Sequence, residues 1–137
     1  DKPGMPSLLV DSAHNEYSAS ILSAAIQNEY DYDRLWLIFG APADKAISQM
    51  MQELFPLAHQ VIVAAADHPR AASPEALAAQ ASDLGYAVQT VDSPEEALIL
   101  AFSQAAEDDL ICATGSIIFI GDLLNHWDRL QSRMLLP

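Results

Sequence analysis

The sequence is poor in cysteine and in positive charge, and each shortage excludes a class of protein. Its 137 residues include a single cysteine, Cys112, so there is no disulfide framework and a reducing compartment is the natural setting. Only six Lys and Arg stand against nineteen Asp and Glu, which gives a formal net charge of −13. Because nucleic acid and anionic membranes are bound by clustered cations, neither is expected as a partner. We expect a cytoplasmic protein.

Long apolar runs and targeting signals are also missing. No segment has the roughly 18 uninterrupted apolar residues that a membrane span needs. The first residues, Asp1-Lys2-Pro3-Gly4, carry no basic stretch followed by an apolar one, so no signal peptide is visible. Hydrophobic residues nevertheless make up 51% of the chain, which is enough for a packed core. We expect one domain over residues 1–137.

Short β-rich apolar runs alternate with Ala- and Leu-rich periodic stretches, and this alternation predicts an α/β fold. The expected fold is a Rossmann-like three-layer domain with a mostly parallel sheet of about five to six strands and helices on both faces. The predicted strands are Ser7–Val10, Leu35–Phe39, Gln60–Ala64, Ala87–Val91 and Leu110–Ala113. The predicted helices are Glu16–Asn28, Lys45–Phe55, Pro74–Leu84, Pro94–Ala106 and Ile117–Gln131.

Local signals mark several helix ends. Ser73-Pro74 and Ser93-Pro94 each place a capping serine before a proline at the first helical position. Glu96, three residues after Ser93, completes a capping box. Gly85 stands where a left-handed residue would end a helix. The run that begins at Ile117 could also form a strand, and only Gly115-Ser116 before it favours a helix.

Ligands of open α/β sheets bind beyond the carboxyl ends of the strands. Two of the six cations, Lys45 and Arg70, fall in the predicted loops at that edge, together with His14 and His68. By contrast, Arg34 begins a strand at the opposite edge. In so acidic a chain, two cations and two histidines at one edge indicate an anion site.

The loop after the first strand, Asp11-Ser12-Ala13-His14-Asn15, has residues suited to a nucleotide. A carboxylate at a strand end can accept both ribose hydroxyls, and the imidazole of His14 can stack on a base or donate a hydrogen bond. The alternative is that Asn15 only caps the following helix and that Asp11 binds loop amides.

Two further loops have groups suited to anions. Arg70, in Asp67-His68-Pro69-Arg70, can hold a carboxylate with two parallel hydrogen bonds. The alternative there is an exposed loop with an Asp–Arg surface pair. Thr114-Gly115-Ser116 places backbone amides and two hydroxyls at a helix start, where anions bind readily.

Several catalytic motifs are absent from the sequence. It has neither the GxxxxGK[ST] phosphate loop nor the GxGxxG fingerprint. The GxSxG elbow and clustered Cys/His zinc ligands are missing as well. Cys112 lies in an apolar strand and is interpreted as a packing residue. No catalytic residue and no metal ligand is therefore assigned to this domain, which is expected to complete a site rather than contain one.

Taken in order, the exit loops resemble the C-terminal domain of the Mur ligase superfamily, in its folylpolyglutamate synthase/dihydrofolate synthase branch. The segments that carry the resemblance cover nearly the whole chain: Leu9-Val10-Asp11-Ser12-Ala13-His14-Asn15, Phe39-Gly40 with Asp44-Lys45, Pro69-Arg70-Ala71, and Thr114-Gly115-Ser116 with Gly121.

The resemblance implies a domain of an ATP-dependent ligase that adds L-glutamate to dihydropteroate or folate through an acyl-phosphate. ATP and Mg²⁺ would be bound mostly by an N-terminal ATPase domain that this sequence does not contain, so the chain alone is expected to be inactive. Asp11, His14 and Asn15 would contact the nucleotide. The incoming glutamate would contact Arg70, Ser116 and again His14, while Lys45 would add positive field near the reacting phosphate.

Two residues depart from the family pattern. Ser12 stands where the family has glycine, and it would be strained if that position required a positive φ. Ala46 replaces the second acid of the family's DKD. Two other functions stay open: the C-terminal domain of a peptidoglycan Mur ligase, and a stand-alone, non-catalytic nucleotide-binding or interaction module.

Overall fold

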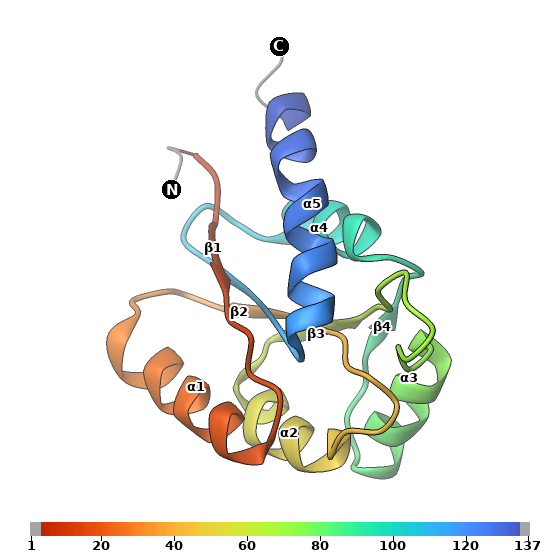
Figure 1. Ribbon diagram of the computed structural model, residues 1–137. Coiled ribbons are helices and arrows are strands. Elements are labelled where there is room, and N and C mark those ends of the chain that lie inside the picture. The colour runs from red at the N-terminus through yellow and green to blue at the C-terminus, as the bar shows by residue number, and fades with distance from the viewer. Residues whose placement is uncertain (1–3, 135–137) are drawn as a thin grey trace.

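The computed structural model describes residues 4–134, with side chains as far as Leu130. Within this part of the chain, five parallel strands form one sheet in the order β1-β5-β2-β3-β4 (Figure 1). The strands are β1 (Ser7–Val10), β2 (Leu35–Phe39), β3 (Gln60–Val63), β4 (Gln89–Thr90) and β5 (Leu110–Thr114).

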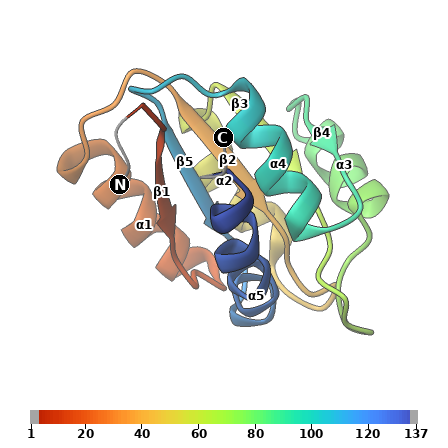
Figure 2. The same ribbon diagram turned by 90° about the horizontal axis from the view of Figure 1, so that it is seen from above.

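Helices cover both faces of this sheet. One face carries α1 (Glu16–Glu29), α2 (Ile47–Leu54), the short 3₁₀ helix η1 (Phe55–Leu57) and α3 (Pro74–Asp83). The other face carries α4 (Pro94–Gln104) and α5 (Ile117–Met134). Figure 2 shows α4 and α5 together on the near side of the sheet. The predicted three-layer α/β fold is confirmed.

The strands are apolar along their whole length because both of their faces are buried. In β2, Leu37 and Phe39 pack into the core beneath α1 and α2, whereas Ile38 packs into the core beneath α4 and α5. These three side chains are fully buried. Such a strand cannot show the alternation of polar and apolar residues that marks a sheet with one wet face.

The predicted caps are present, with one correction. Ser73 accepts a hydrogen bond from the Ala76 N–H at 3.1 Å, and Ser93 accepts one from the Glu96 N–H at 3.2 Å. Gly85 ends its helix with φ +90°. The carboxylate of Glu96, however, accepts the N–H of Asp92 at 2.9 Å, one residue before the predicted partner.

Two predicted elements are shortened most, by three residues each. The helix predicted from Lys45 begins at Ile47, because the Lys45 N–H donates to Pro42 O at 3.2 Å and closes a turn first. The strand predicted at Ala87–Val91 is reduced to Gln89–Thr90, because this edge strand pairs with β3 at only two positions. The helix predicted after Gly115-Ser116 is confirmed and extends to Met134.

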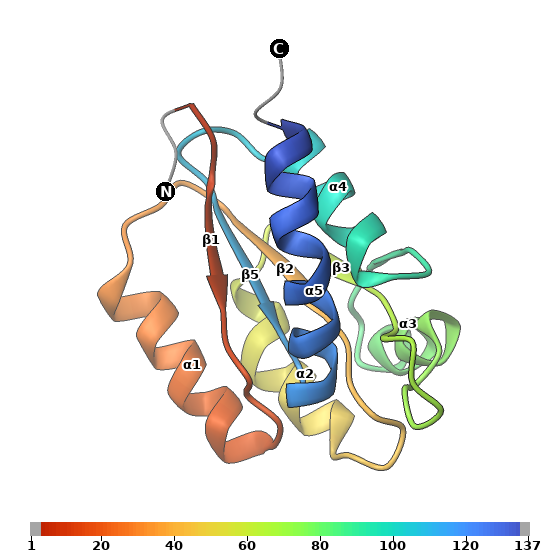
Figure 3. The same ribbon diagram turned by 45° about the horizontal axis from the view of Figure 1, so that its top comes forward.

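The carboxyl ends of the parallel strands meet at one edge of the sheet, which we call the exit edge. There β5 lies between β1 and β2, yet α5 covers the opposite face from α1 and α2. Figure 3 shows β1, β5 and β2 side by side, with α5 starting where they end. A crevice forms where neighbouring strands send their helices to opposite faces, and ligands of such folds bind there.

Candidate functional site

Four of the loops at the exit edge contain the candidate residues, and backbone hydrogen bonds join several of them. They are the loops at residues 11–15, 40–46 and 65–72, the last of which we call the arginine loop, and the turn at residues 114–116. The Gly40 N–H donates to Thr114 O at 3.2 Å. The Ala43 N–H donates to Arg70 O at 2.8 Å, and Pro42 and Ala71 form an antiparallel bridge. These contacts join the loops at residues 40–46 and 65–72 and the turn at residues 114–116 into one connected surface.

Two glycines allow this close approach. Gly115 has φ +133°, and a Cβ atom placed on it would lie 1.9 Å from Gly40 O. A Cβ atom on Gly40 would lie 2.1 Å from the ring of Phe119. No other residue type fits either position without moving backbone or a buried ring.

The first exit loop is ordered by its own side chains. Oδ1 of Asp11 accepts the Ala13 N–H at 2.9 Å. Asn15 caps α1 by accepting the Ser18 N–H at 2.8 Å in a capping box. The ring of His14 is exposed, with Nδ1 3.1 Å from Ser12 O. The contacts of the alternative interpretation are thus present, and they leave the carboxylate of Asp11 half-buried at the strand end.

Serine at position 12 is accommodated without backbone strain. Among the described residues, positive φ angles occur at glycines only. Ser12 therefore does not adopt the left-handed conformation in which glycine would be required. The other departure, Ala46, stands at the N-cap of α2, where no side chain accepts a hydrogen bond from the helix. An Asp at this position could cap the helix.

Arg70 projects from the arginine loop and pairs with the neighbouring loop. Its Nη2 lies 2.8 Å from Oδ2 of Asp44, and both side chains are more than half exposed. The Asp–Arg surface pair expected as an alternative exists, but its acid is Asp44. The hydrogen bond from Arg70, more than any other cause, lowers the pKa of Asp44 below its ordinary value. Lys45 is exposed beside this pair.

Ser116 lies at the base of the edge. It is 4% exposed, and its hydroxyl caps α5 by accepting the Phe119 N–H at 3.0 Å. Together with His68 and Ala71 it lines a hollow of about 10 Å³, room for roughly one water molecule. Since pockets that hold small ligands measure roughly 300–1,000 Å³, this hollow is too small to hold such a ligand by itself.

Two buried side chains lie close behind the edge. Thr114 is fully buried, and its Oγ1 has no hydrogen-bond partner among the described residues. Burial, with a smaller contribution from the charge of Asp11, raises the pKa of the Cys112 thiol to about 12. Cys112 is therefore a thiol at neutral pH, as expected of a packing residue.

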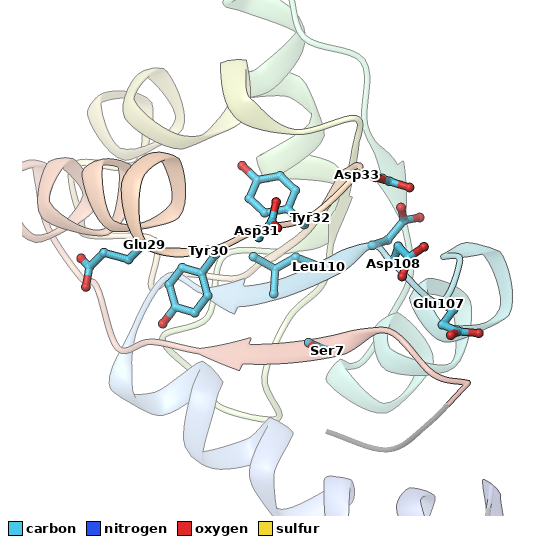
Figure 4. A pocket seen from close by; sticks show the side chains of 10 residues that line it. Ser7, Glu29, Tyr30, Asp31, Tyr32, Asp33, Glu107, Asp108 and Leu110 are labelled. Atoms are coloured by element: carbon cyan, nitrogen blue, oxygen red, sulfur yellow. The ribbon is translucent and has the colours of Figure 1, made fainter.

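A larger cavity of about 420 Å³ lies at the other end of the strands, which we call the amino edge. Figure 4 shows the acidic side chains around it. Its lining is predominantly acidic and includes Glu29, Asp31, Asp33, Glu107, Asp108 and Asp109. The cation at this edge, Arg34, lies 3.8 Å from Asp109. Such a lining repels phosphates and carboxylates.

Asp109 is a structural residue of the amino edge that sequence reasoning missed. It is 3% exposed, and its Oδ2 accepts Trp36 Nε1–H at 2.9 Å and the Ala106 N–H at 2.8 Å. Burial raises its pKa, but these two hydrogen bonds and Arg34 outweigh burial and leave the pKa below its ordinary value. No local pattern indicates the contact with Trp36, because the two residues are 73 positions apart.

A second missed group joins α4, α5 and the arginine loop. Asp122 and His126 are four residues apart on α5 and lie 3.2 Å apart, and Asp122 also accepts the Asp67 N–H at 2.8 Å. The spacing of four on a helix could have indicated the first contact. The second contact joins residues 55 apart and depends on the tertiary fold.

Neither a membrane span nor a metal cluster is found in the described part of the chain. None of the helices described there is long and apolar enough to cross a bilayer. The same residues contain no group of three or more His, Cys, Asp or Glu side chains arranged to hold a metal ion.

The fold and the exit edge define an α/β domain with a crevice at a topological switch point of its sheet. A family model, the glutamate ligase domain of Mur ligases, matches residues 2–117. The chain belongs to this Mur ligase family, and it corresponds to the C-terminal region of its folylpolyglutamate synthase/dihydrofolate synthase members. The resemblance inferred from the exit loops is confirmed.

Curated relatives carry folate ligase names. The probable bifunctional folylpolyglutamate synthase/dihydropteroate synthase of Haloferax volcanii is 34% identical over 125 residues, which are 90% of this chain and 15% of the relative. The dihydrofolate synthase/folylpolyglutamate synthase of Bacillus subtilis is 27% identical over 120 residues, 86% of this chain and 27% of that protein.

Solved structures share the fold. The Mycobacterium tuberculosis folylpolyglutamate synthase complexed with ADP and AMPPCP matches with a TM-score of 0.79 and 28% identity, over 86% of this chain and 29% of that one. FolC of E. coli in complex with ADP matches with a TM-score of 0.81 over 94% of this chain and 30% of that one. At 22% identity, the FolC match shows the fold alone. The chain thus spans less than a third of the length of these relatives.

Proposed function

We propose that this chain is the glutamate-binding domain of an ATP-dependent ligase that adds L-glutamate to dihydropteroate or a folate. The observation that carries the proposal is that Ser116 lines a hollow too small to hold a ligand, while Arg70 and Lys45 are exposed on the two loops that also line it. A surface of this kind becomes a pocket only when a second wall closes on it. An N-terminal ATPase domain, which the length of the relatives leaves room for, would supply that wall.

The proposed reaction has two steps. The γ-phosphoryl group of ATP passes to a carboxylate of the acceptor, which leaves ADP and an acyl-phosphate. The amine of glutamate then attacks the acyl carbon, and inorganic phosphate leaves as the amide bond forms. Because water also attacks an acyl-phosphate, a domain that closes over the substrates both excludes water and aligns the amine.

Each residue of the exit edge has a role in this scheme. Arg70 would hold a carboxylate of the incoming glutamate with its planar fork, exchanging its exposed pairing with Asp44 for a ligand. Ser116 and His14 would flank the glutamate. Lys45 would add positive field near the transferred phosphate.

Nucleotide contact would come from the loop at residues 11–15. The carboxylate of Asp11 stands at the end of β1, where it can accept ribose hydroxyls, with His14 and Asn15 beside it. ATP and Mg²⁺ would be held mostly by the N-terminal ATPase domain, where the phosphate loop belongs. Asp11 would then close the nucleotide site from the far side.

The test is an assay of ADP release in a ligase chain that carries residues 1–137 behind its N-terminal ATPase region. Release that requires both L-glutamate and a pteroate or folate acceptor is expected. An Arg129→Ala variant is the control and should release ADP as the parent does, because Arg129 is an exposed cation on α5, away from the exit edge. Absence of release with every pteroate and folate tried would refute the folate assignment.

Two other outcomes would each favour a different function. Turnover with a UDP-linked peptide acceptor but not with folates would assign the domain to the peptidoglycan branch. Tight nucleotide binding by the 137-residue chain alone, measured by calorimetry, would favour a stand-alone binding module. The ligase proposal expects little affinity for ATP without the phosphate loop.

A further inference from the structure

The carboxylate of Asp122 ties the arginine loop to helix α5. Its Oδ2 accepts the backbone N–H of Asp67 at 2.8 Å, three residues before Arg70. Its Oδ1 lies 3.2 Å from Nε2 of His126, one helical turn further along α5. The side chain of Asp122 is only 18% exposed, so its orientation is set by these neighbours. A charged acceptor forms one of the stronger hydrogen bonds available to a backbone amide.

His126 lies between two carboxylates on two different helices. Its Nε2 faces Asp122, and its Nδ1 lies 3.8 Å from Oε2 of Glu95 at the start of α4. Nδ1 is buried and has no hydrogen-bond partner among the described residues. The chain of contacts Glu95–His126–Asp122 thus runs from α4 through α5 to the backbone of the arginine loop.

The arginine loop is held at two places. Its second half is bound to the loop at residues 40–46, through the Ala43 N–H to Arg70 O at 2.8 Å and the Ala72 N–H to Ala41 O at 2.9 Å. Its first half meets α5 through Asp122. The two attachments come from opposite sides of the crevice, so together they fix the path of the backbone that presents Arg70.

We propose that Asp122 is a positioning residue for Arg70, and that His126, which lies between Asp122 and Glu95, orients Asp122. The inference rests on the proposed function, in which Arg70 receives glutamate. Asp122 acts through the Asp67 amide and touches no substrate. A loop fixed before the ligand arrives costs less to order on binding, so an arginine loop released from Asp122 should bind glutamate more weakly.

The contact itself is tested on the 137-residue chain by amide hydrogen exchange. Asp122→Ala should speed exchange at the Asp67 amide about tenfold or more, the size expected for losing a bond to a charged acceptor. Asp122→Asn keeps an oxygen that can accept the same N–H and should stay within about threefold of the parent. Unchanged exchange at Asp67 in Asp122→Ala would overturn the proposal.

Glu96 provides a matched control. Its carboxylate accepts the Asp92 N–H at 2.9 Å, the same type of bond at a similar length in a neighbouring loop. Glu96→Ala should speed exchange at Asp92 and leave Asp67 as in the parent. Faster exchange at Asp67 in this variant as well would show a general loosening and refute a specific hold by Asp122.

The functional role is tested by the kinetics of the ligase chain with its ATPase region. Asp122→Ala should raise KM for glutamate about tenfold with kcat and KM for ATP within about twofold, the pattern of lost ligand binding. Asp122→Asn should have a KM for glutamate close to that of the parent, because the amide oxygen can still accept the Asp67 N–H. His126→Ala should raise KM for glutamate about threefold. Glu96→Ala should have the same KM for glutamate as the parent. A variant Asp122→Ala that is less stable but has an unchanged KM for glutamate would reduce Asp122 to a structural role.

Failure of the two proposals can be told apart. If the parent ligase shows no glutamate-dependent turnover, the proposed function is refuted and a role of Asp122 in glutamate binding falls with it. The exchange measurement still decides whether Asp122 holds the arginine loop. If turnover is present and only the KM effect is missing, the function stands and the positioning role is refuted.

Discussion

The two edges of the sheet differ in charge and in shape. The amino edge has a cavity of about 420 Å³ with a predominantly acidic lining, and the exit edge has a hollow of about 10 Å³ beside Arg70 and Lys45. Size alone would place the ligand at the amino edge. Charge disfavours an anion at the amino edge, because a group of carboxylates repels phosphate and carboxylate ligands.

This difference shows that a large cavity in an isolated domain need not be the place where its ligand binds. The carboxylate of Asp109 at the amino edge is committed to Trp36 and to the backbone of Ala106, so it stabilises the fold. At the exit edge, the exposed pair of Arg70 and Asp44 contributes little to the fold and can exchange partners. A cleft shared between two domains looks shallow in either one alone.

The largest expected effect tests whether the close approach of Gly115 to Gly40 at the exit edge stabilises the fold. Gly115→Ala should lower the free energy of unfolding by about 4 kcal/mol, because the new side chain is strained at φ +133° and meets Gly40 O. Urea unfolding measures the loss. Gly121→Ala is the control: nothing lies within 4 Å of its Cβ position, and alanine in a helix should raise stability by up to about 1 kcal/mol. A Gly115 variant as stable as the parent would show that the two loops move apart freely.

The next effect tests the structural role of the amino edge. Asp109→Ala should lower the free energy of unfolding at pH 7 by about 3 kcal/mol, because Trp36 Nε1–H and the Ala106 N–H lose their acceptor. Urea unfolding is the measurement, and the exposed neighbour Asp108→Ala is the control. Equal losses in the two variants would contradict the assignment.

The same variant has a predicted pH dependence. The pKa of Asp109 is lower in the folded protein than its ordinary value, so the stability that it provides is present above the unfolded pKa of about 3.9 and is lost as pH falls through the folded pKa. The difference between parent and Asp109→Ala should therefore shrink below about pH 4. A difference that stays constant down to pH 2.5 would show that ionisation of Asp109 is not involved.

A third effect separates binding from stability at the exit edge. Arg70→Ala should raise KM for glutamate about tenfold or more in the ligase, because a bidentate carboxylate contact is lost. The urea midpoint should stay the same, since the pair with Asp44 is exposed. Arg70→Lys should rescue only in part, because lysine lacks the planar fork. An unchanged KM for glutamate in Arg70→Ala would show that Arg70 does not bind glutamate.

A smaller effect concerns the departure at position 46. Ala46→Asp should raise the free energy of unfolding by about 1 kcal/mol by supplying the missing N-cap of α2. Ala43→Asp adds the same charge to the same loop outside the cap and is the control. Equal behaviour of the two variants in thermal unfolding would show that charge, and not capping, is responsible.

The smallest expected effect is an absence of reaction at Cys112. Because the pKa of this buried thiol is about 12, roughly one molecule in ten thousand carries a thiolate at pH 8. Iodoacetamide should label the unfolded chain and leave the folded one unmodified over hours. Rapid labelling of the folded chain would show that β5 opens behind the exit edge.

The sequence was sufficient to predict the elements that lie between two helix layers. Strands such as Leu35–Phe39 are apolar throughout because both faces are covered, and the boundaries of Leu35–Phe39 were predicted correctly. Prediction failed where local preference was overruled. Ala87–Val91 has the composition of a strand, but only Gln89–Thr90 pairs with β3. Lys45 is a good helix former, yet a turn through Pro42 delays the helix to Ile47.

For the candidate site, the sequence predicted which residues lie at the exit edge but not how they are held. The order of strands and loops places Asp11, Arg70 and Ser116 at strand ends, and this follows from chain order alone. The pairing of Arg70 with Asp44 and the bond from Asp67 to Asp122 do not follow. They join residues 26 and 55 positions apart, whose contact depends on how the loops fold back.

By itself, the sequence determined the α/β class, the acidic character and the family of this protein, because burial on both strand faces and ordered loop motifs are local properties of the chain. Tertiary structure alone decided that β5 lies between β1 and β2 with its helix on the opposite face, which creates the crevice at the exit edge. It also decided that Asp109 is buried in the fold and that Asp44 stays exposed at the exit edge. Those outcomes depend on packing between distant segments, which no local pattern encodes.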